Sequence, residues 1–246
     1  MIFKKAISIS VLIFFLILFC GGILIQFLNE DMFKNTEWTP PIFILTAAVL
    51  CSINQKTRTV FLLIIAGLIG FSSEIIGVIT SFPYGGYEYT DKLGYKLFDV
   101  PLVLICAWII VSSFALDLIS FLNIKKIFFP FIFASITTYY DLLIDPLMSG
   151  PLEYWVWNAE SGGFYGVPFE NFFGWFLVSL FISVLPWKTW SNSMFPLIVN
   201  LLLPTFFITT SFVNKLYFPG ALGLIMVLTY VLIIFRSNKF KPENLS

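Results

Sequence analysis

Two aspartates lie four residues apart at the end of an apolar segment. In "TTYYDLLIDPLM" these are Asp141 and Asp145, and an α-helix would place both on one face, one turn apart. A carboxylate inside hydrocarbon costs about 2.5–3.5 kcal/mol on insertion scales, so this pair needs a partner, water or a function. Because two adjacent carboxyl groups do not readily both ionise, we expect one to hold a proton as general acid. Such a pair suits the protonation of an electron-rich alkene.

The depth of each acid in its segment suggests its role. Asp141 lies deeper, so we expect it to be the general acid, with Asp145 nearer the loop positioning water or accepting its proton. Glu74 lies in another apolar segment and is expected to orient either aspartate. Structural alternatives stay open: an interfacial acid bonded to Tyr or Thr hydroxyls for Asp141, a helix end before Pro146 for Asp145, and a clamp between helices for Glu74. We expect Asp117 to be a structural acid beside basic residues.

The chain contains no histidine. This excludes His-ligated metal sites, Ser-His-Asp and Cys-His nucleophiles, and the His-rich iron clusters of membrane hydroxylases. The three cysteines lie in apolar segments, and their odd number argues against a disulfide framework or a cysteine metal site. We therefore expect no metal and no cofactor, and a chemistry that relies on carboxyl, hydroxyl, amide and aromatic groups.

The composition is that of a membrane protein. Hydrophobic residues make up 59% of the chain and charged residues 11%, with a mean hydropathy of +0.92. The net charge is zero, which gives no electrostatic case for a nucleic-acid partner. We predict an all-α polytopic bundle forming a single transmembrane domain over residues 1–246, with eight helices and seven as the alternative. The apolar segments are 7–28, 40–53, 59–81, 100–122, 127–145, 171–187, 194–213 and 217–235.

Basic residues predict the orientation. The first apolar segment is too long for a signal peptide and lacks a cleavage site, so we interpret it as an uncleaved helix. With eight helices, ten basic residues fall on the amino-terminal side and four on the other. The positive-inside rule then places both termini in the cytoplasm of a multi-pass cell-membrane protein, with loops 82–99 and 146–170 outside. The ten are Lys4, Lys5, Lys56, Arg58, Lys125, Lys126, Lys188, Arg236, Lys239 and Lys241; the four are Lys34, Lys92, Lys96 and Lys215.

The two outer loops lie at the same depth as the three acids. Both loops are rich in aromatic residues, paired glycines and prolines, which favours ordered turns. Small residues at 67, 70, 73 and 77 would let a neighbouring helix approach Glu74 closely. We expect the loops and the helix that follows to line a substrate site through Tyr84, Tyr87, Trp157, Tyr165, Asn171 and Trp175. The alternatives are an interfacial aromatic belt and, for the asparagine, a helix cap.

Several ordered motifs carry a family resemblance. They are "GFSSEIIGVITSFPYGGYEYTDKLGYKLFDVPLVLICAW", "DLLIDPLM", "WVW" and "GGFYGVPFENFFGWF", within about residues 67–176. Together they resemble the carotenoid-biosynthesis membrane family that includes bisanhydrobacterioruberin hydratases and carotenoid 1,2-hydratases. The resemblance implies a hydratase, a carbon–oxygen lyase, that adds water to the terminal double bond of an acyclic carotenoid ψ-end through a tertiary carbocation. It also implies a carotenoid substrate in the lipid bilayer, with other carotenoid-pathway enzymes as candidate partners.

Three other functions remain open. "DLLID" matches the Asp-x-x-x-Asp spacing that holds Mg²⁺ and diphosphate in intramembrane prenyltransferases, but the chain has no second aspartate pair and few basic residues outside. A carotenoid end-group cyclase would also protonate an alkene. A non-enzymatic transporter or assembly factor would likewise retain acids within helices.

Overall fold

A computed structural model describes residues 2–28, 36–158, 163–187, 190 and 193–237 of the chain. Within these ranges the chain forms eight α-helices, which confirms the predicted all-α class. The helices are α1 (Ile2–Ile25), α2 (Thr39–Ser52), α3 (Thr57–Thr80), α4 (Leu104–Ser120), α5 (Phe129–Ser149), α6 (Phe169–Ser183), α7 (Met194–Val213) and α8 (Tyr217–Arg236).

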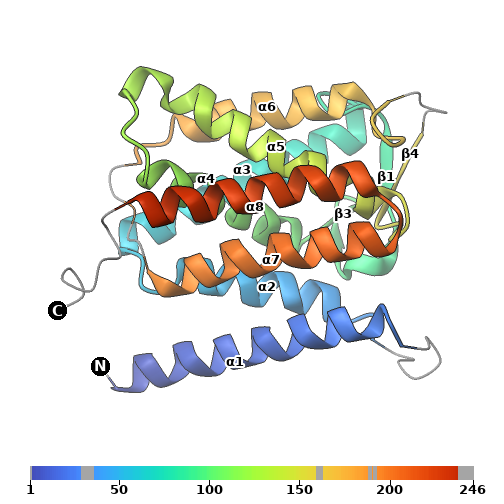
Figure 1. Cartoon of the computed structure of the whole chain (residues 1–246). Helices are drawn as coiled ribbons and strands as arrows, with labels where there is room; N and C mark the ends of the chain where they lie inside the picture. Colours follow the sequence, from blue (N-terminus) through green and yellow to red (C-terminus); the bar gives the residue numbers. More distant parts are fainter. Residues whose placement is uncertain (1, 29–35, 159–162, 188–189, 191–192, 238–246) are drawn as a thin grey trace.

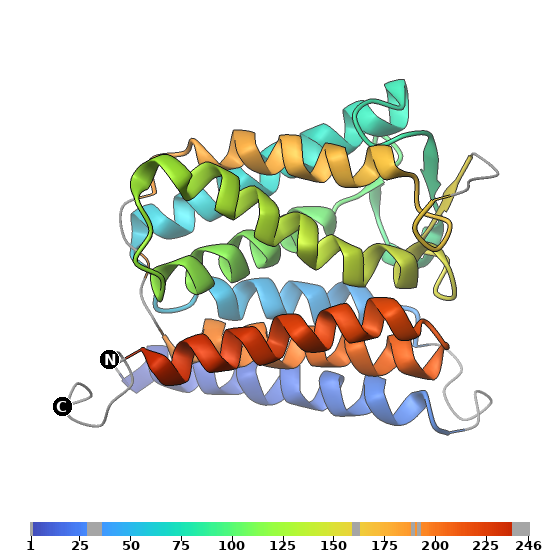
Figure 2. The same ribbon diagram turned by 45° about the horizontal axis from the view of Figure 1, so that its top comes forward.

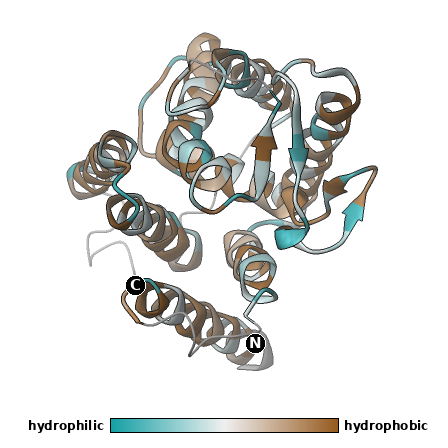
Figure 3. Ribbon diagram, turned by 90° about the vertical axis from the view of Figure 1, so that its right-hand side faces the viewer, coloured by the Kyte–Doolittle hydropathy of each residue, from teal (hydrophilic) through white to brown (hydrophobic). Residues whose placement is uncertain are grey.

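The helices have the length and surface of membrane spans. The described residues contain five helices that are long and apolar enough to cross a bilayer: α1, α3, α5 with its preceding turn, α7 and α8. The other three helices are apolar but shorter; α2 has 14 residues, a rise of about 21 Å. Large apolar side chains lie exposed on the bundle, among them Ile79, Phe181 and Phe235. Figure 3 shows hydrophobic residues along all the helices, seen from the end that carries the strands. The molecule is a polytopic membrane protein.

Four helices surround the predicted acids. α3 contacts α4 and α6, and α5 also contacts both, so α3, α4, α5 and α6 form a closed ring of neighbours. α2, α7 and α8 pack against one side of this ring, and α1 lies at the edge of the bundle against α2 and α7 (Figures 1 and 2). Small residues explain the close α3–α4 contact: a Cβ on Gly67 would lie 2.7 Å from the Ile105 carbonyl oxygen, and one on Gly70 would lie 2.1 Å from the Trp108 ring.

Short strands cover one end of the bundle. β1 (Tyr87–Tyr89) pairs antiparallel with β4 (Trp155–Trp157), and β2 (Lys96–Leu97) pairs with β3 (Val100–Pro101). Figure 1 shows these strands at the end opposite to the start of α1 and the end of α8. Side chains alternate along a strand, so Tyr87 and Tyr89 face the helices while Glu88 between them is exposed. Loops 82–99 and 146–170 are thus ordered in part as two small two-stranded sheets, which the sequence did not predict.

Two helix limits differ from the sequence-based expectation. α5 continues through Pro146 to Ser149, although the loop was expected to begin at residue 146. Proline removes one helical hydrogen bond, but burial of Leu147 and Met148 in the core offsets that loss. α4 begins at Leu104 rather than near residue 100, because Val100 and Pro101 pair with β2 instead.

The orientation of the bundle gives a direct test. Lys92 and Lys125 are both exposed. Lys92 belongs to the segment between β1 and β2, and Lys125 to the segment that joins α4 to α5 at the opposite end of the bundle (Figure 1). In a protein whose native cysteines are replaced, we expect Lys92→Cys to react with a membrane-impermeant maleimide added outside the cell and Lys125→Cys to react only after permeabilisation. The reverse labelling pattern would place both termini outside and contradict the orientation drawn from the basic residues.

Candidate active site

Asp141 and Asp145 are joined by one amide group. α5 and α6 pack side by side, and Asn171 in the first turn of α6 lies between the two carboxyl groups. Its Nδ2 donates to Asp141 Oδ2 at 2.8 Å and to Asp145 Oδ2 at 2.6 Å. All three side chains are at most 2% exposed. The predicted placement of the two aspartates on one helical face, with Asn171 beside them, is therefore observed.

The hydrogen bonds distinguish the two carboxyl groups. Asp145 accepts at both oxygens, because Trp155 Nε1 donates to its Oδ1 at 3.1 Å. Asp141 accepts only at Oδ2; its Oδ1 is buried and has no hydrogen-bond partner in the described part of the chain. Two donors favour the ionised form of Asp145, whereas the free oxygen of Asp141 can carry a proton. The two carboxyl groups therefore differ in their hydrogen bonding, although they lie on one helical face.

Glu74 on α3 accepts hydrogen bonds from three aromatic side chains. Its Oε2 accepts from the hydroxyls of Tyr87 at 2.5 Å and Tyr89 at 3.0 Å, and its Oε1 accepts from Trp108 Nε1 at 3.3 Å. The carboxyl group is 4% exposed. Glu74 lies close enough to both aspartates to interact with them electrostatically, so the three acids form one buried cluster. The three acids, which the sequence placed at one depth, lie near one another in the structure.

The β1–β4 sheet links Glu74 to the aspartate pair. Tyr89 pairs with Trp155 across the two strands, and their rings meet edge-on with centroids 5.7 Å apart. Tyr89 donates to Glu74, and Trp155 donates to Asp145. Burial raises the pKa of Tyr89 far above its ordinary value, and the Glu74 charge raises it further. The phenol therefore stays protonated and remains a donor. Trp157 is connected to the acids through Tyr87, whose ring lies 5.1 Å from its own.

Tyr84 and Trp175 complete the wall around the acids. The Tyr84 ring fills the space between α3 and α6, where Cβ atoms on Gly77 and Gly174 would lie 2.8 Å and 2.6 Å from it. Its hydroxyl is 2.6 Å from the Ser73 hydroxyl. Trp175 stacks on Trp108 with ring centroids 4.3 Å apart. Both residues predicted to bind substrate are thus next to residues that hold the acids.

Tyr165 lies elsewhere. Its side chain is 46% exposed and its ring packs edge-on against Phe164. Tyr165 has a φ of 55° and lies in a turn, directly before Gly166. The structure does not bring Tyr165 to the carboxyl groups, although the sequence placed it with the other loop aromatics.

A small apolar chamber adjoins the acids. Its volume is about 70 Å³, and it lies between α2, α4, α5 and α7. The indole rings of Trp108, Trp155 and Trp175 line it, and two of these indoles donate to carboxylates on their other side. Tyr140 also lines it, with a buried hydroxyl that has no hydrogen-bond partner within the described residues. The three indoles therefore separate an apolar space from the acid cluster.

Sequence reasoning missed three residues that touch the acids: Trp108, Tyr89 and Trp155. Tyr89 and Trp155 were noted among the loop aromatics but not selected, since strand pairing was not foreseen. Trp108 lies near the start of α4, within an apolar segment. Gly70 on α3, where a Cβ would lie 2.1 Å from the Trp108 ring, was the signal that a large side chain of a neighbouring helix packs there.

Asp117 forms a second buried cluster at the opposite end of the bundle. It is 1% exposed and accepts from Trp190 Nε1 at 2.5 Å, from Asn200 Nδ2 at 3.2 Å and from the Tyr230 hydroxyl. These partners join α4 to α7 and α8. These hydrogen bonds come from neutral groups, and the expectation of basic neighbours for Asp117 stays a prediction.

Removal of the Asp117 carboxylate should destabilise the protein. Asp117→Ala removes the acceptor of three donors, two of which, Asn200 and Tyr230, are buried. We expect the free energy of unfolding to fall by about 3 kcal/mol. Asp117→Asn keeps the shape and an acceptor, so its loss should be smaller. Thermal unfolding in detergent, monitored by circular dichroism, measures both. An alanine variant that melts with the wild type would show that this cluster does not hold the helices together.

Comparisons with known proteins identify a family for this chain. Residues 40–230 match the family model described as carotenoid biosynthesis protein. Over 115 residues the chain is 31% identical to bisanhydrobacterioruberin hydratase of Haloarcula japonica, a match that covers 45% of this chain and 38% of that protein. The chain thus matches well under half of the length of this relative. The search of solved structures gives no match.

Proposed function

We propose that this chain, which belongs to the carotenoid biosynthesis protein family, is a hydratase that adds water to the terminal double bond of an acyclic carotenoid ψ-end. The observation that carries the proposal is the buried Asp141–Asn171–Asp145 bridge, with one carboxyl oxygen free. The relative named as a bisanhydrobacterioruberin hydratase supports the reaction class. The bilayer supplies the apolar substrate.

The reaction begins with a proton on Oδ1 of Asp141. Transfer of this proton to the less substituted alkene carbon forms a C–H bond, breaks the π bond and leaves a tertiary carbocation. Water attacks the cation to form the C–O bond, and Asp145 takes the released proton. That proton then returns to Asp141, so the pair is regenerated and the net change is the addition of one water molecule. Asn171 holds both carboxyl groups in register through the cycle.

The indole rings have two roles in this scheme. Their faces stabilise the carbocation, since a cation near an aromatic face gains about 0.5–2 kcal/mol. Their N–H groups orient Glu74 and Asp145. Because Trp108, Trp155 and Trp175 separate the chamber from the acids, the substrate's end reaches Asp141 only when these rings shift to admit it.

The residues present fit a diphosphate substrate poorly. A cation between Asp141 and Asp145 would need the oxygens that now accept from the Asn171 amide. Of the four lysines expected outside, Lys92 pairs with Glu153 and Lys96 with Asp91. Lys215 is exposed between α7 and α8, and Lys34 lies outside the described residues. This observation supports alkene protonation over prenyl transfer.

Product analysis tests the function. Purified protein in lipid nanodiscs is incubated with lycopene under argon. The products are separated by liquid chromatography, and their masses are determined by mass spectrometry. The proposal predicts a tertiary alcohol heavier than lycopene by one water molecule. A cyclised isomer of unchanged mass, a prenylated product or unreacted lycopene would overturn it.

A further inference from the structure

Two open apolar grooves lie on the flanks of the bundle. One of about 280 Å³ runs between α1, α2 and α7, and the other of about 480 Å³ lies between α3 and α6. We name them the α1–α7 groove and the α3–α6 groove. Both open towards the bilayer, so either has the chemistry to receive an elongated apolar molecule.

The α1–α7 groove adjoins the inner chamber. The two spaces share four lining residues: Ile44 of α2, Met148 of α5, Tyr154 and Phe207 of α7. Beyond this junction the chamber is lined by Trp108, Trp155 and Trp175, which contact or adjoin the acids. Apolar side chains therefore extend from the outer edge of the bundle to the indole wall, with the four shared residues between the two spaces.

Aromatic rings follow this route. The Phe43 ring stacks on Phe15 at 5.0 Å and meets Phe206 at 5.2 Å, and Phe206 meets Phe207 at 5.8 Å. Flat rings in sequence suit a conjugated polyene, whose π face can pack on theirs. On α1 the lining extends from Ile17 to Ile25, a rise of about 12 Å, so the groove suits an extended chain.

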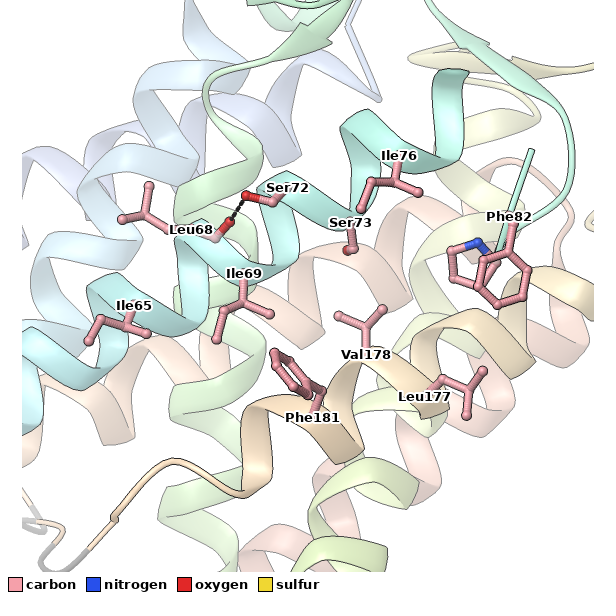
Figure 4. A pocket seen from close by; sticks show the side chains of 11 residues that line it. Ile65, Leu68, Ile69, Ser72, Ser73, Ile76, Phe82, Leu177, Val178 and Phe181 are labelled. Atoms are coloured by element: carbon pink, nitrogen blue, oxygen red, sulfur yellow. Dashed lines mark hydrogen bonds between the residues drawn. The ribbon is translucent and has the colours of Figure 1, made fainter. Parts of the chain in front are cut away.

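The α3–α6 groove stops short of the acids. Figure 4 shows it lined by Leu68, Ile69 and Ser72 of α3 and by Leu177, Val178 and Phe181 of α6. Ser72 turns its hydroxyl to the Leu68 carbonyl at 2.7 Å. Tyr84, which is 1% exposed, fills the space behind the groove between α3 and α6. The groove shares no lining residue with the chamber.

We propose that the α1–α7 groove holds the tail of a linear, conjugated apolar substrate, whose terminal double bond is delivered through the Ile44–Phe207 junction into the chamber. This assignment rests on the proposed function for the identity of the reacting end. α1 forms the outer wall of the route, so the substrate enters sideways from the bilayer rather than from water.

Substitution of Gly21 offers a way to block the α1–α7 groove. A Cβ on Gly21 would have no heavy atom within 4 Å outside its own helix, whereas one on Gly22 would lie 2.8 Å from the Phe206 ring. A side chain can therefore start at Gly21 without a clash at its Cβ, and Gly21→Phe places an aromatic ring at a residue that lines the groove. Ile17→Phe is a second blocking variant, at a lining position that is 61% exposed. Ser72→Phe adds the same ring to the α3–α6 groove and serves as the matched control.

Lycopene binding to each variant in nanodiscs is measured by quenching of tryptophan fluorescence, with product formation followed in parallel. We expect Gly21→Phe and Ile17→Phe to weaken binding at least tenfold and Ser72→Phe to bind as the wild type does. Binding that both α1 substitutions leave unchanged, or that only Ser72→Phe weakens, would overturn the proposal. A wild type that binds lycopene through this groove without hydrating it would support the route and contradict the proposed function alone.

Discussion

Asp141→Asn is expected to lower turnover by about 10²–10⁴-fold, the usual loss when a general acid is removed. Asparagine keeps the size of the side chain and an oxygen that can accept from the Asn171 amide, but its amide does not supply an acidic proton. Substrate affinity should change little, because Asp141 does not line the chamber or the α1–α7 groove. Steady-state product formation and the fluorescence assay measure the two quantities separately.

Asp145→Asn is the comparison within the pair. Its turnover should fall less sharply, since water can lose its proton to another acceptor, whereas protonation of the alkene needs the acid. Thermal unfolding of both variants shows whether either loss comes from misfolding. Near-wild-type turnover in well-folded Asp141→Asn would make the pair structural and transfer the search for the acid to Glu74.

Asn171→Leu is expected to lower turnover by about 10²-fold, the scale of the cost when catalytic groups move by about 1 Å. Leucine has the same branching at Cγ and the same number of side-chain heavy atoms but donates to neither carboxyl group, so Asp141 and Asp145 lose the bridge that sets their positions. Asn171 acts here as a positioning residue. Affinity for lycopene should therefore stay close to that of the wild type.

A matched substitution at the other end of the bundle separates positioning from stability. Asn200 is equally buried and donates to Asp117, far from the proposed chemistry. Asn200→Leu should lower the melting temperature while turnover of the folded fraction is retained. Equal losses of turnover in Asn171→Leu and Asn200→Leu would show that any buried asparagine matters only for folding.

The sequence predicted much of the scaffold because lipid imposes strong constraints on it. Each span must be a continuous apolar helix, so the eight helices are visible as eight apolar segments. The cost of a carboxylate in hydrocarbon likewise marked Glu74, Asp141 and Asp145 as a set. Gly67, Gly70 and Gly77 signalled a close neighbour for α3, and the structure has α4, Trp108 and Tyr84 there.

The features that the sequence did not predict depend on contacts between segments far apart in the chain. Strands of three residues carry almost no sequence signal, so the Tyr89–Trp155 register that joins Glu74 to Asp145 was not foreseen. Tyr165 was grouped with its loop neighbours because composition does not reveal the direction of a side chain in a turn. The α1–α7 groove also depends on packing alone: Gly21 has open space beside it, while Gly22 has the Phe206 ring.

The most direct test of the central claim is to follow the atoms of water into the product. The protein is incubated with lycopene under argon in water labelled with both 18O and deuterium, and the product is analysed by mass spectrometry and NMR. Protonation by Asp141 followed by capture of the cation predicts an alcohol with one 18O on the tertiary carbon and one deuterium on the adjacent carbon, at a strongly reduced rate with Asp141→Asn. An oxygen that does not come from water, or deuterium in a cyclised isomer without oxygen, would contradict the account.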